Sequence, residues 1–262
     1  SNNKNPLFNG SSEFKMDDYF NYLSGLDYNI KNIKNKIGNI NFVRNKKNPL
    51  FFDVGSPPKK RFSKGYQSGP LSFEYYINNN KIITNCGYGN KISKKAELIS
   101  RLTSAQSTLS IDDTSVVKFE RSKLINNAFG TAIKSSFEIM DISYDDTPDI
   151  FSVSAKHNAY EKNFNYTHSR LLKINKKNSN LYGQDDLFPS KDTNLIRNYN
   201  VRFHLYPGVS AVQTMGKSSI LISVEKNKSL IFKTNEGNLS LEKSIFLGRN
   251  QILNNFCINI SG

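Results

Sequence analysis

The fold is decided by the segment Leu71-Ser72-Phe73-Glu74-Tyr75-Tyr76-Ile77 and by the segment that follows it, Asn78-Asn79-Asn80-Lys81-Ile82-Ile83-Thr84. In the first segment, apolar side chains recur at every second position, which is the period of a β-strand with one face turned to a core. Three consecutive asparagines are typical of a turn. The second segment then returns as the partner strand, so residues 71–84 predict an antiparallel hairpin.

The rest of the chain repeats this pattern of short apolar segments, for example at residues 116–120, 133–142 and 252–260. Turn-forming residues separate them, and the aspartate pairs Asp145-Asp146 and Asp185-Asp186 are expected in such turns. Helical patterns are confined to residues 16–23 and 94–102. Many short strands without intervening helices predict an all-β fold, a large antiparallel β-sandwich of two or more stacked sheets with few short helices.

Size and composition fit such a fold. The 262 residues suffice for one large all-β domain or for two ordinary domains. The chain has 18 Phe and 13 Tyr but no Trp, so a core must use aromatic and β-branched side chains, which strands favour. Two cysteines, Cys86 and Cys257, are too few for a disulfide framework or a structural zinc site, and we expect buried free thiols.

The chain is strongly basic, with a formal net charge of +14. The first 65 residues carry 12 Lys and Arg against 5 acidic residues. A positive potential attracts acidic polysaccharide, nucleic acid or anionic lipid, and its sign does not choose among them. Equally, much of this charge could be ordinary solvated surface. No apolar run approaches the roughly 18 to 20 residues of a membrane span, and the glycine motifs of nucleotide-binding loops are missing.

The three histidines, His157, His168 and His204, are the first candidates for acid–base chemistry. A lone histidine in a strand protein is more often a hydrogen-bonded structural residue. His157 and His168, however, are close enough in sequence for a hairpin to bring both rings to one end of a sheet. Tyr160 would add a phenol there, and Arg170 a group that binds carboxylates.

Arginine grips a carboxylate through its planar fork of donors, which lysine cannot do. Arg101, Arg170 and Arg202 are therefore better candidates for binding an acidic substrate than the many lysines. The alternative for each is structural: every one adjoins a strand and could hold a turn or pair with an internal acid.

A set of short motifs appears in a fixed order along the chain. They are Asp53-Val54-Gly55-Ser56-Pro57-Pro58, Gly69-Pro70-Leu71-Ser72-Phe73-Glu74, Asn85-Cys86-Gly87, Arg101-Leu102-Thr103-Ser104-Ala105-Gln106-Ser107-Thr108, Ala155-Lys156-His157-Asn158-Ala159-Tyr160, His168-Ser169-Arg170, Gly183-Gln184-Asp185-Asp186 and Arg202-Phe203-His204-Leu205-Tyr206-Pro207. Their order and spacing resemble the β-sandwich domain of heparinase II/III-like polysaccharide lyases, in particular its bacterial branch.

The resemblance implies that residues 1–262 are a single sandwich domain, with residues 1–47 as a polar N-terminal edge. Enzymes of that family join the sandwich to an N-terminal α/α-toroid, which is absent from this chain, and cleave uronic-acid polysaccharides by β-elimination. The partners implied are thus an acidic polysaccharide and the toroid of a full-length protein, with a periplasmic or secreted location. Alone, this chain is expected to be inactive.

The resemblance also implies roles for single residues. His157, Tyr160, His168 and His204 are the expected catalytic residues. The expected substrate-binding residues are Gln67, Asn85, Arg101, Gln106, Arg170 and Arg202. Several of these depart from the family's pattern, because Gln67, Gly69, Asn85 and Gln106 stand where zinc-binding or catalytic relatives have His or Asp. We therefore expect no metal and no other cofactor.

Two other hypotheses remain open from the sequence. The His-to-Gln departures fit a carbohydrate-binding or structural module without catalysis. Binding of single-stranded nucleic acid would need exposed stacking aromatics, and most aromatics here alternate as core residues do. We therefore expect no nucleic-acid partner.

Overall fold

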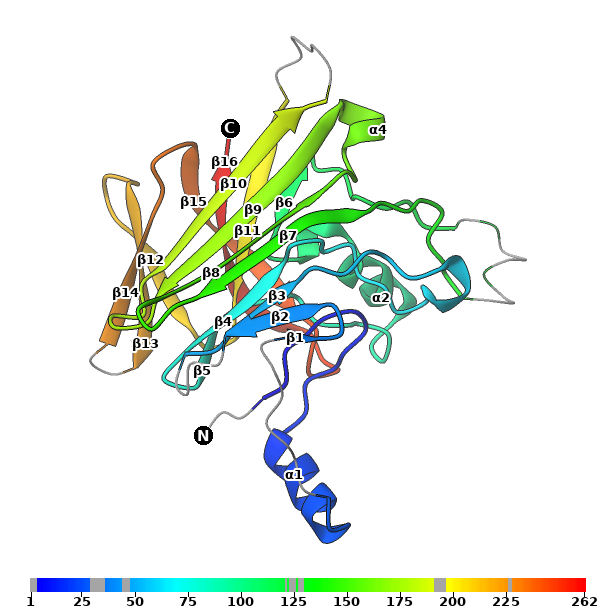
Figure 1. The fold of residues 1–262 in the computed structure, drawn as a ribbon, viewed down its shortest axis with the longest axis horizontal. Helices are drawn as coiled ribbons and strands as arrows, with labels where there is room; N and C mark the ends of the chain where they lie inside the picture. The colour runs from blue at the N-terminus through cyan, green and yellow to red at the C-terminus, as the bar shows by residue number, and fades with distance from the viewer. Residues whose placement is uncertain are drawn as a thin grey trace.

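A computed structural model describes residues 4–28, 36–43, 48–120, 122, 126, 130–190, 197–225 and 228–262. Antiparallel sheets dominate it, and helices are few and short (Figure 1). The predicted all-β antiparallel sandwich is therefore confirmed. Within the described residues, no helix combines the length and apolarity needed to cross a bilayer.

The largest sheet runs through both halves of the chain and, within the described residues, has nine strands. In spatial order these are β1 (Lys36–Ile37), β2 (Ile40–Val43), β3 (Leu50–Asp53), β4 (Phe73–Ile77), β5 (Asn80–Thr84), β11 (Tyr199–Leu205), β16 (Leu253–Ser261) and β15 (Asn238–Phe246), and β6 (Leu109–Ile111) also pairs with β11. The join between β5 and β11 brings the predicted hairpin beside a strand more than a hundred residues later.

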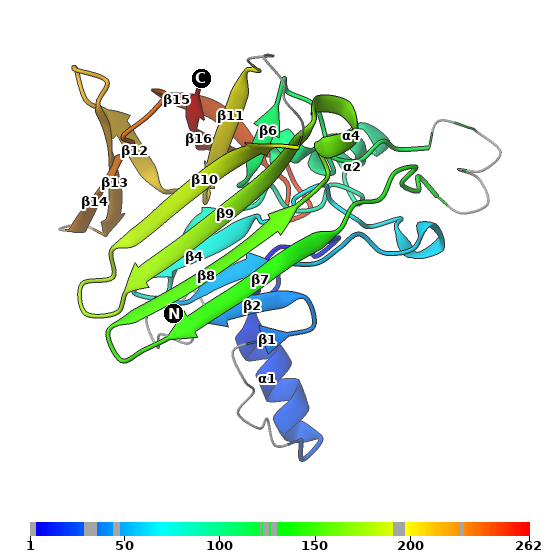
Figure 2. The same cartoon turned by 45° about the horizontal axis from the view of Figure 1, so that its top comes forward.

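Two smaller sheets pack against the largest one (Figure 2). The second sheet has the order β10 (Leu181–Pro189), β9 (Tyr166–Asn175), β8 (Ile150–His157) and β7 (Ile139–Asp146). The third consists of β12 (Ser210–Gln213), β13 (Ser219–Glu225) and β14 (Lys228–Lys233). Both aspartate pairs expected in turns lie instead on strands, β7 and β10, because pairing to a neighbouring strand overrides their weak strand preference.

The core lies between the sheets and follows the period of two. Along β8, buried and half-buried residues alternate, and Phe151 and Val153 point inward. They belong to one apolar cluster with Phe52 and Phe73 of the largest sheet. Each such side chain contributes about 1.5–3 kcal/mol by leaving water, so the alternation fixes which face of β8 meets the core.

The predicted hairpin is present as β4 and β5. Asn78 and Asn79 adopt positive φ angles of 49° and 62°, a conformation that asparagine tolerates and that a tight turn requires. The first strand starts at Phe73 rather than at residue 71, because Leu71 also has a positive φ, 56°, and is not extended.

One predicted strand is wrong and another is only partly correct. Residues 116–120 form an isolated bridge from Phe119 to Ile133 instead of a strand. Of residues 133–142, only 139–142 belong to a strand, β7, which begins at Ile139. Val116 and Val117 are nevertheless buried, in a cluster with Tyr66 and Tyr160. Their apolar character reflects packing of an irregular segment, which periodicity cannot distinguish from a strand.

The two predicted helices are present as α1 (Met16–Gly25) and α2 (Lys94–Ser100). A short helix that was not predicted, α4 (Glu161–Phe164), lies between β8 and β9, and single 3₁₀ turns lie at Lys60–Phe62 and Thr103–Ala105. Helix α2 begins where the Ser93 hydroxyl accepts a hydrogen bond from the backbone of Ala96, an N-cap. Helix α1 projects away from the sheets (Figure 1).

Residues 4–14, which we call the N-terminal strap, are built into the domain. Leu7 is fully buried against Tyr206 and Phe246. At the end of the strap, the Glu13 carboxylate accepts hydrogen bonds from Tyr206 (2.6 Å) and Arg249 (2.9 Å). The polar N-terminal edge expected for residues 1–47 thus contains a segment held by both core packing and charge.

Both cysteines are buried and free, as predicted. Burial raises the pKa of Cys86 and of Cys257 to about 12, so neither is a thiolate near neutral pH.

Candidate functional site

The hairpin of β8 and β9 places His157 directly opposite His168. Nε2 of His157 lies 3.0 Å from Nδ1 of His168, and Nε2 of His168 lies 2.6 Å from Oδ1 of Asp185. Nδ1 of His157 accepts a hydrogen bond from the backbone N–H of Ala159, so that nitrogen carries no proton. His157 therefore donates to His168, and His168 donates to Asp185, with both rings neutral.

Asp185 also receives the predicted carboxylate binder, Arg170. Nε and Nη2 of Arg170 contact the two carboxylate oxygens at 2.7 and 3.0 Å, a bidentate pair. Nη1 donates to the backbone oxygens of Leu71 and Ser107. The carboxylate that Arg170 holds here is internal to the protein.

The electrostatics of this group follow from its burial. Burial lowers the pKa of His157 and of His168, and the Arg170 charge acts in the same direction. Burial would raise the pKa of Asp185, but Arg170 and His168 outweigh it and hold that pKa well below its ordinary value. The Asp185 carboxylate is thus the fixed negative charge, and the imidazoles stay neutral near pH 7.

His204 lies apart from that pair. Its Nε2 donates to the backbone oxygen of Ser104 (3.0 Å), and its Nδ1 accepts from the Ser244 hydroxyl (3.1 Å). Burial lowers its pKa to about 4. Ser107 links it to the first group, because the Ser107 hydroxyl accepts from the backbone N–H of His204 while the Ser107 carbonyl accepts from Arg170.

The remaining predicted aromatic and arginine side chains also have internal partners. The Tyr160 ring lies 5.5 Å from that of His157, and its hydroxyl donates to the Leu109 carbonyl. Arg101 is fully buried, and its guanidinium donates to three backbone oxygens, those of Ser63, Tyr66 and Thr131.

Arg202 is the exception in exposure among the predicted site residues. Its side chain is 14% exposed and pairs with Asp113 at 2.7 Å. It also donates to the Ser110 hydroxyl.

Two of the three predicted amide residues meet at the end of helix α2, and the third, Asn85, holds the backbone of Ser107. Gln67 and Gln106 both donate to the Ser100 carbonyl at 2.8 Å. The amide oxygen of Asn85 accepts from the backbone of Ser107, and that of Gln67 accepts from Gly10 of the N-terminal strap. Each amide joins segments that are distant in sequence.

These amides do not fit a metal. A carbonyl oxygen needs a donor, and the Gln Nε2 groups supply it, whereas a metal ligand presents only a lone pair. A Cβ at Gly69 would lie 2.8 Å from Cγ of Gln106, so an aspartate there would displace that glutamine. No group of three His, Cys, Asp or Glu side chains that could hold a metal occurs among the described residues.

The structure therefore brings most predicted site residues together as a buried hydrogen-bonded network. All except Arg202 are nearly or completely inaccessible to solvent. Their catalytic and substrate-binding roles remain predictions. What the network does in the structure is hold the segments around residues 63–71 and 85–108.

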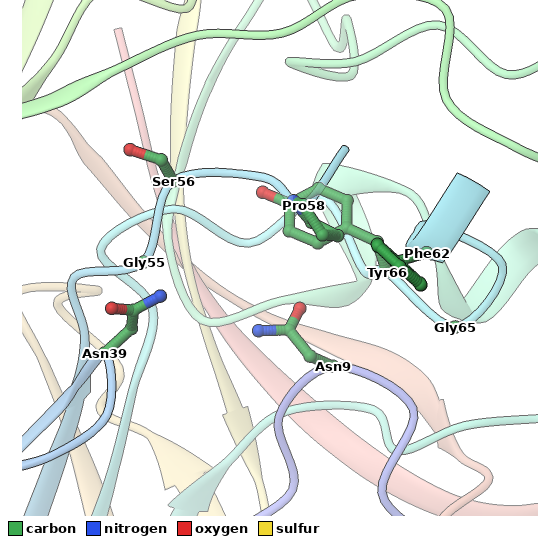
Figure 3. A pocket seen from close by; sticks show the side chains of 8 residues that line it. All are labelled: Asn9, Asn39, Gly55, Ser56, Pro58, Phe62, Gly65 and Tyr66. Atoms are coloured by element: carbon green, nitrogen blue, oxygen red, sulfur yellow. The ribbon is translucent and has the colours of Figure 1, made fainter. Parts of the chain in front are cut away.

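Those segments border a pocket that the sequence analysis did not identify. It has a volume of about 320 Å³, at the lower end of the roughly 300–1,000 Å³ of ligand pockets. Its lining comes from the strap, the β1–β2 turn and residues 55–66, and consists of Asn9, Asn39, Gly55, Ser56, Pro58, Phe62, Gly65 and Tyr66. Figure 3 shows the amides of Asn9 and Asn39 beneath the loop that carries Ser56 and Pro58.

Tyr66 contributes a hydroxyl group to this pocket. The side chain is 4% exposed, and its hydroxyl has no hydrogen-bond partner within the part of the chain that the structure describes. Its ring reaches toward the 55–58 loop with the hydroxyl at the far end (Figure 3). Because it makes no hydrogen bond to the described residues, this hydroxyl is available to water or to a ligand.

Asp53 lies directly behind the lining. Its carboxyl accepts from the Gly55 N–H (2.9 Å) and from the Asn9 amide (3.3 Å), both residues of the pocket. Burial raises its pKa to about 7. A Cβ at Gly55 would lie 2.9 Å from Cβ of Asn39, so only glycine allows the loop to approach that wall.

A signal for this pocket was present in the sequence. The motif Asp53-Val54-Gly55-Ser56-Pro57-Pro58 points to this loop, but a single aspartate before a turn also has a purely structural explanation. Asn9 and Asn39 gave no signal, because they reach the pocket only through the folding of the strap and of β1–β2.

The family model described as "Heparinase II/III-like, C-terminal" matches residues 35–261 of the chain. No match was found among curated protein sequences.

Solved structures agree with that match. The heparan sulfate lyase HepC from Pedobacter heparinus superposes with a TM-score of 0.75 at 13% identity, covering 100% of this chain and 42% of that chain. Two heparinase III structures give TM-scores of 0.73 and 0.70 at 12% and 14% identity, with 99% and 98% of this chain and 41% and 42% of theirs covered. At these identities the likeness shows the fold, and the chain spans about two fifths of these structures.

Proposed function

Because the chain belongs to the heparinase II/III-like family, we propose that it is the C-terminal β-sandwich of a polysaccharide lyase that cleaves uronic-acid-containing acidic polysaccharide by β-elimination. The observation that carries the proposal is the family match over residues 35–261, supported by superposition of the whole chain on a heparan sulfate lyase. The net charge of +14 suits a polyanionic substrate. In this proposal an N-terminal α/α-toroid completes the enzyme, which is periplasmic or secreted.

β-Elimination from a uronate requires a base, an acid and a group that neutralises the uronate carboxylate. A base removes the proton from C5 of the uronate, the bond from C4 to the leaving oxygen breaks, and a C4–C5 double bond forms. An acid supplies the proton that the leaving oxygen takes up, so no water is consumed. Neutralising the uronate carboxylate makes the C5 proton more acidic.

We propose that His157, His168, Arg170 and Asp185 act as positioning residues. Arg170 holds the carbonyls of Leu71 and Ser107, and the amides of Gln67 and Gln106 hold Ser100. Gln67 also binds the backbone of Gly10, next to Asn9 of the pocket. The network thus fixes the loops from which a glycan-facing wall is built, and Tyr66 and Asp53 are the groups nearest to that wall.

A second candidate is a non-catalytic module that binds acidic carbohydrate. The burial of His157, His168 and His204, each with its ring nitrogens already hydrogen-bonded, favours it. In this reading the pocket binds a glycan, and no group of the chain moves a proton.

The test is an activity assay of the native full-length protein on a panel of uronate-containing polymers, followed by the ultraviolet absorbance of the unsaturated product. The lyase proposal expects product with at least one polymer. Titration of the same polymers into the 262-residue chain separates the alternatives, because binding without any product from the full-length protein supports the module.

A further inference from the structure

The outer face of the second sheet is open to solvent. Figure 2 shows β10, β9, β8 and β7 side by side, and no described helix or strand lies across them. Alternate residues of these strands belong to the core, so the residues between them point outward. We call this face the outer platform. It consists of Tyr182, Gln184, Asp186 and Phe188 on β10, Ser169, Leu171 and Lys173 on β9, and Ser152, Ser154 and Lys156 on β8.

Two aromatic side chains stand exposed on the platform. Tyr182 is 51% exposed and Phe188 is 47% exposed. They lie six positions apart on one strand, which separates the two residues by about 20 Å. Large exposed rings add little to folding, because their stabilising effect comes from burial. At this spacing they offer two stacking surfaces to an extended ligand that is several sugar rings long.

The side chains between the two rings form an ordered polar row. The Tyr182 hydroxyl donates to Oε1 of Gln184 (3.1 Å), and Nε2 of Gln184 donates to both Asp186 oxygens (3.0 Å each). These bonds fix the Gln184 side chain although it is exposed, so less conformational entropy is lost when a ligand binds. The Asp186 carboxylate keeps lone pairs that can accept hydrogen bonds from sugar hydroxyls.

Beside this row, the platform is low and rich in hydroxyl groups. Ser169 lies opposite Asp186, and Ser152 and Ser154 lie on the next strand, β8. The three serine hydroxyls make no hydrogen bond to described residues, so they are available to water or to a ligand. Serine is short compared with tyrosine and phenylalanine. A ligand chain can therefore lie against the serines while its rings contact the aromatic side chains.

The charges on the platform are few and of both signs. Lys173 is exposed, lies opposite Tyr182 and forms no ion pair with a described residue. Lys156 is paired with Asp141 at 3.0 Å, and Asp186 adds a negative charge. A single unpaired lysine on this described face suits a ligand with carboxylates on some of its rings. Nucleic acid carries a phosphate on every nucleotide and would find too few cations here.

We propose that the outer platform is a second polysaccharide-binding surface, which shares no residue with the pocket at Tyr66. Sugar rings stack on Tyr182 and Phe188, and their hydroxyl groups bond to the polar row and the serines. A uronate carboxylate binds Lys173. The ligand is a stretch of the acidic polysaccharide named above, so in this respect the inference rests on the proposed function. The surface holds the polymer without taking part in its cleavage.

The chain contains no Trp, so one Trp placed on the platform reports a ligand at that place. Tyr182→Trp keeps a stacking ring, and its fluorescence is followed while the 262-residue chain is titrated with the same panel of uronate-containing polymers. We expect the emission to shift to shorter wavelength and to saturate with at least one polymer, because a stacked sugar displaces water from the indole. Tyr22→Trp, at a 66%-exposed position on α1, is the matched control and should show no shift. No shift in Tyr182→Trp with any polymer, or an equal shift in the control, would overturn the proposal.

Removing both rings tests their contribution without changing the charge. Tyr182→Ala with Phe188→Ala should weaken calorimetric binding of the responsive polymer at least about tenfold, since aromatic anchors supply much of the affinity of a binding surface. Tyr22→Ala with Tyr28→Ala removes two rings that are 66% and 69% exposed elsewhere, and should leave the affinity unchanged. Both double variants should keep the melting temperature of the unmodified chain. Unchanged affinity in the first, or an equal loss in the second, would contradict the platform.

The spacing of the two rings predicts a dependence on ligand length. A hexasaccharide of the responsive polymer can contact both rings at once, whereas a disaccharide reaches only one. The hexasaccharide should therefore shift the emission of Tyr182→Trp at a concentration at least about tenfold lower. A single-stranded oligothymidylate should cause no shift. Equal potency of the disaccharide, or a shift with the oligothymidylate as large as with the polymer, would overturn the proposal.

These outcomes can be separated from the proposed lyase activity. A full-length protein that makes no unsaturated product, while Tyr182→Trp reports bound polymer, would remove the lyase and keep the platform. A full-length protein that makes the product, while Tyr182→Trp shows no shift, would keep the lyase and remove the platform.

Discussion

His157 and His168 face each other across β8 and β9, and one imidazole donates to the other over 3.0 Å. Both rings are fully buried, and the pair ends on the Asp185 carboxylate. Protonating two buried imidazoles costs free energy, because burial disfavours the charged form. The pair therefore stabilises the fold near neutral pH and destabilises it at acidic pH.

Removing the charge of Asp185 should destabilise the domain. Asp185→Asn leaves the 1%-exposed Arg170 side chain without its counterion, and an unpaired buried charge costs roughly 3–5 kcal/mol. Urea unfolding gives the free energy. Asp186→Asn, on the outer face of the same strand, where the carboxylate contacts the exposed Gln184, is the control and should stay within about 0.5 kcal/mol. Equal effects would refute the internal ion pair.

Stability should rise with pH between about 4 and 6.5. The pKa values of His157, His168 and His204 are all lowered in the fold, so in this window the unfolded chain binds more protons, and stability is lost as pH falls. The contribution of Asp53 to stability falls as pH rises in this window, because its pKa is raised to about 7. The three histidines together outweigh this single carboxyl group. Measuring the free energy of unfolding across this pH range tests the predicted sign of the slope.

His204→Gln should flatten that dependence. The shift of His204 from its ordinary pKa to about 4 corresponds to roughly 3 kcal/mol of stability present above pH 6.5 and lost toward pH 4. The variant costs stability at pH 7 but loses less on acidification. A slope identical to that of the unmodified chain would show that His204 is not buried as a neutral ring.

Zinc should not stabilise the domain. Gln67 uses its amide N–H groups on the carbonyls of Gly87 and Ser100, and its oxygen accepts from the backbone N–H of Gly10, so a metal would have to compete with that donor. Melting temperatures with zinc and with a chelator should therefore agree. Gln67→Ala should cost roughly 1–3 kcal/mol by leaving buried groups unpaired, whereas Gln184→Ala, on the exposed face of β10, should be nearly neutral.

Shortening a buried side chain of the N-terminal strap should weaken glycan binding from a distance. Leu7 is fully buried, and Leu7→Ala should cost roughly 2–5 kcal/mol. Because Asn9 lines the pocket two residues later, a looser strap should also lower glycan affinity. Titration and limited proteolysis measure both effects. Phe14→Ala, at an exposed position beyond the strap's core contacts, is the control and should change neither.

Much of the fold could be predicted because alternation along the chain is a local signal. The hairpin of β4 and β5 and the inward row of β8 are read directly from the spacing of apolar residues. The approach of His157 and His168 was also predictable, since they are only eleven residues apart in a hairpin.

The rest depended on contacts between distant segments. Strand β10 has few apolar residues, so Asp185 was expected in a turn, and its pairing with Arg170 is set by register alone. Histidine and arginine are residue types that suggest catalysis. When buried, their side chains also donate hydrogen bonds to the backbone carbonyls of irregular loops. The pocket at Tyr66 needs the strap, the β1–β2 turn and residues 55–66 to meet, which no local pattern encodes.

The central claim is β-elimination by the full-length protein, and the most direct test is mass spectrometry of its products from a uronate polymer in ¹⁸O-labelled water. The account predicts fragments lighter by one water than hydrolysis products, with a double bond in the terminal uronate and no ¹⁸O incorporated by the cleavage. Saturated fragments that carry one ¹⁸O atom would identify hydrolysis and contradict it.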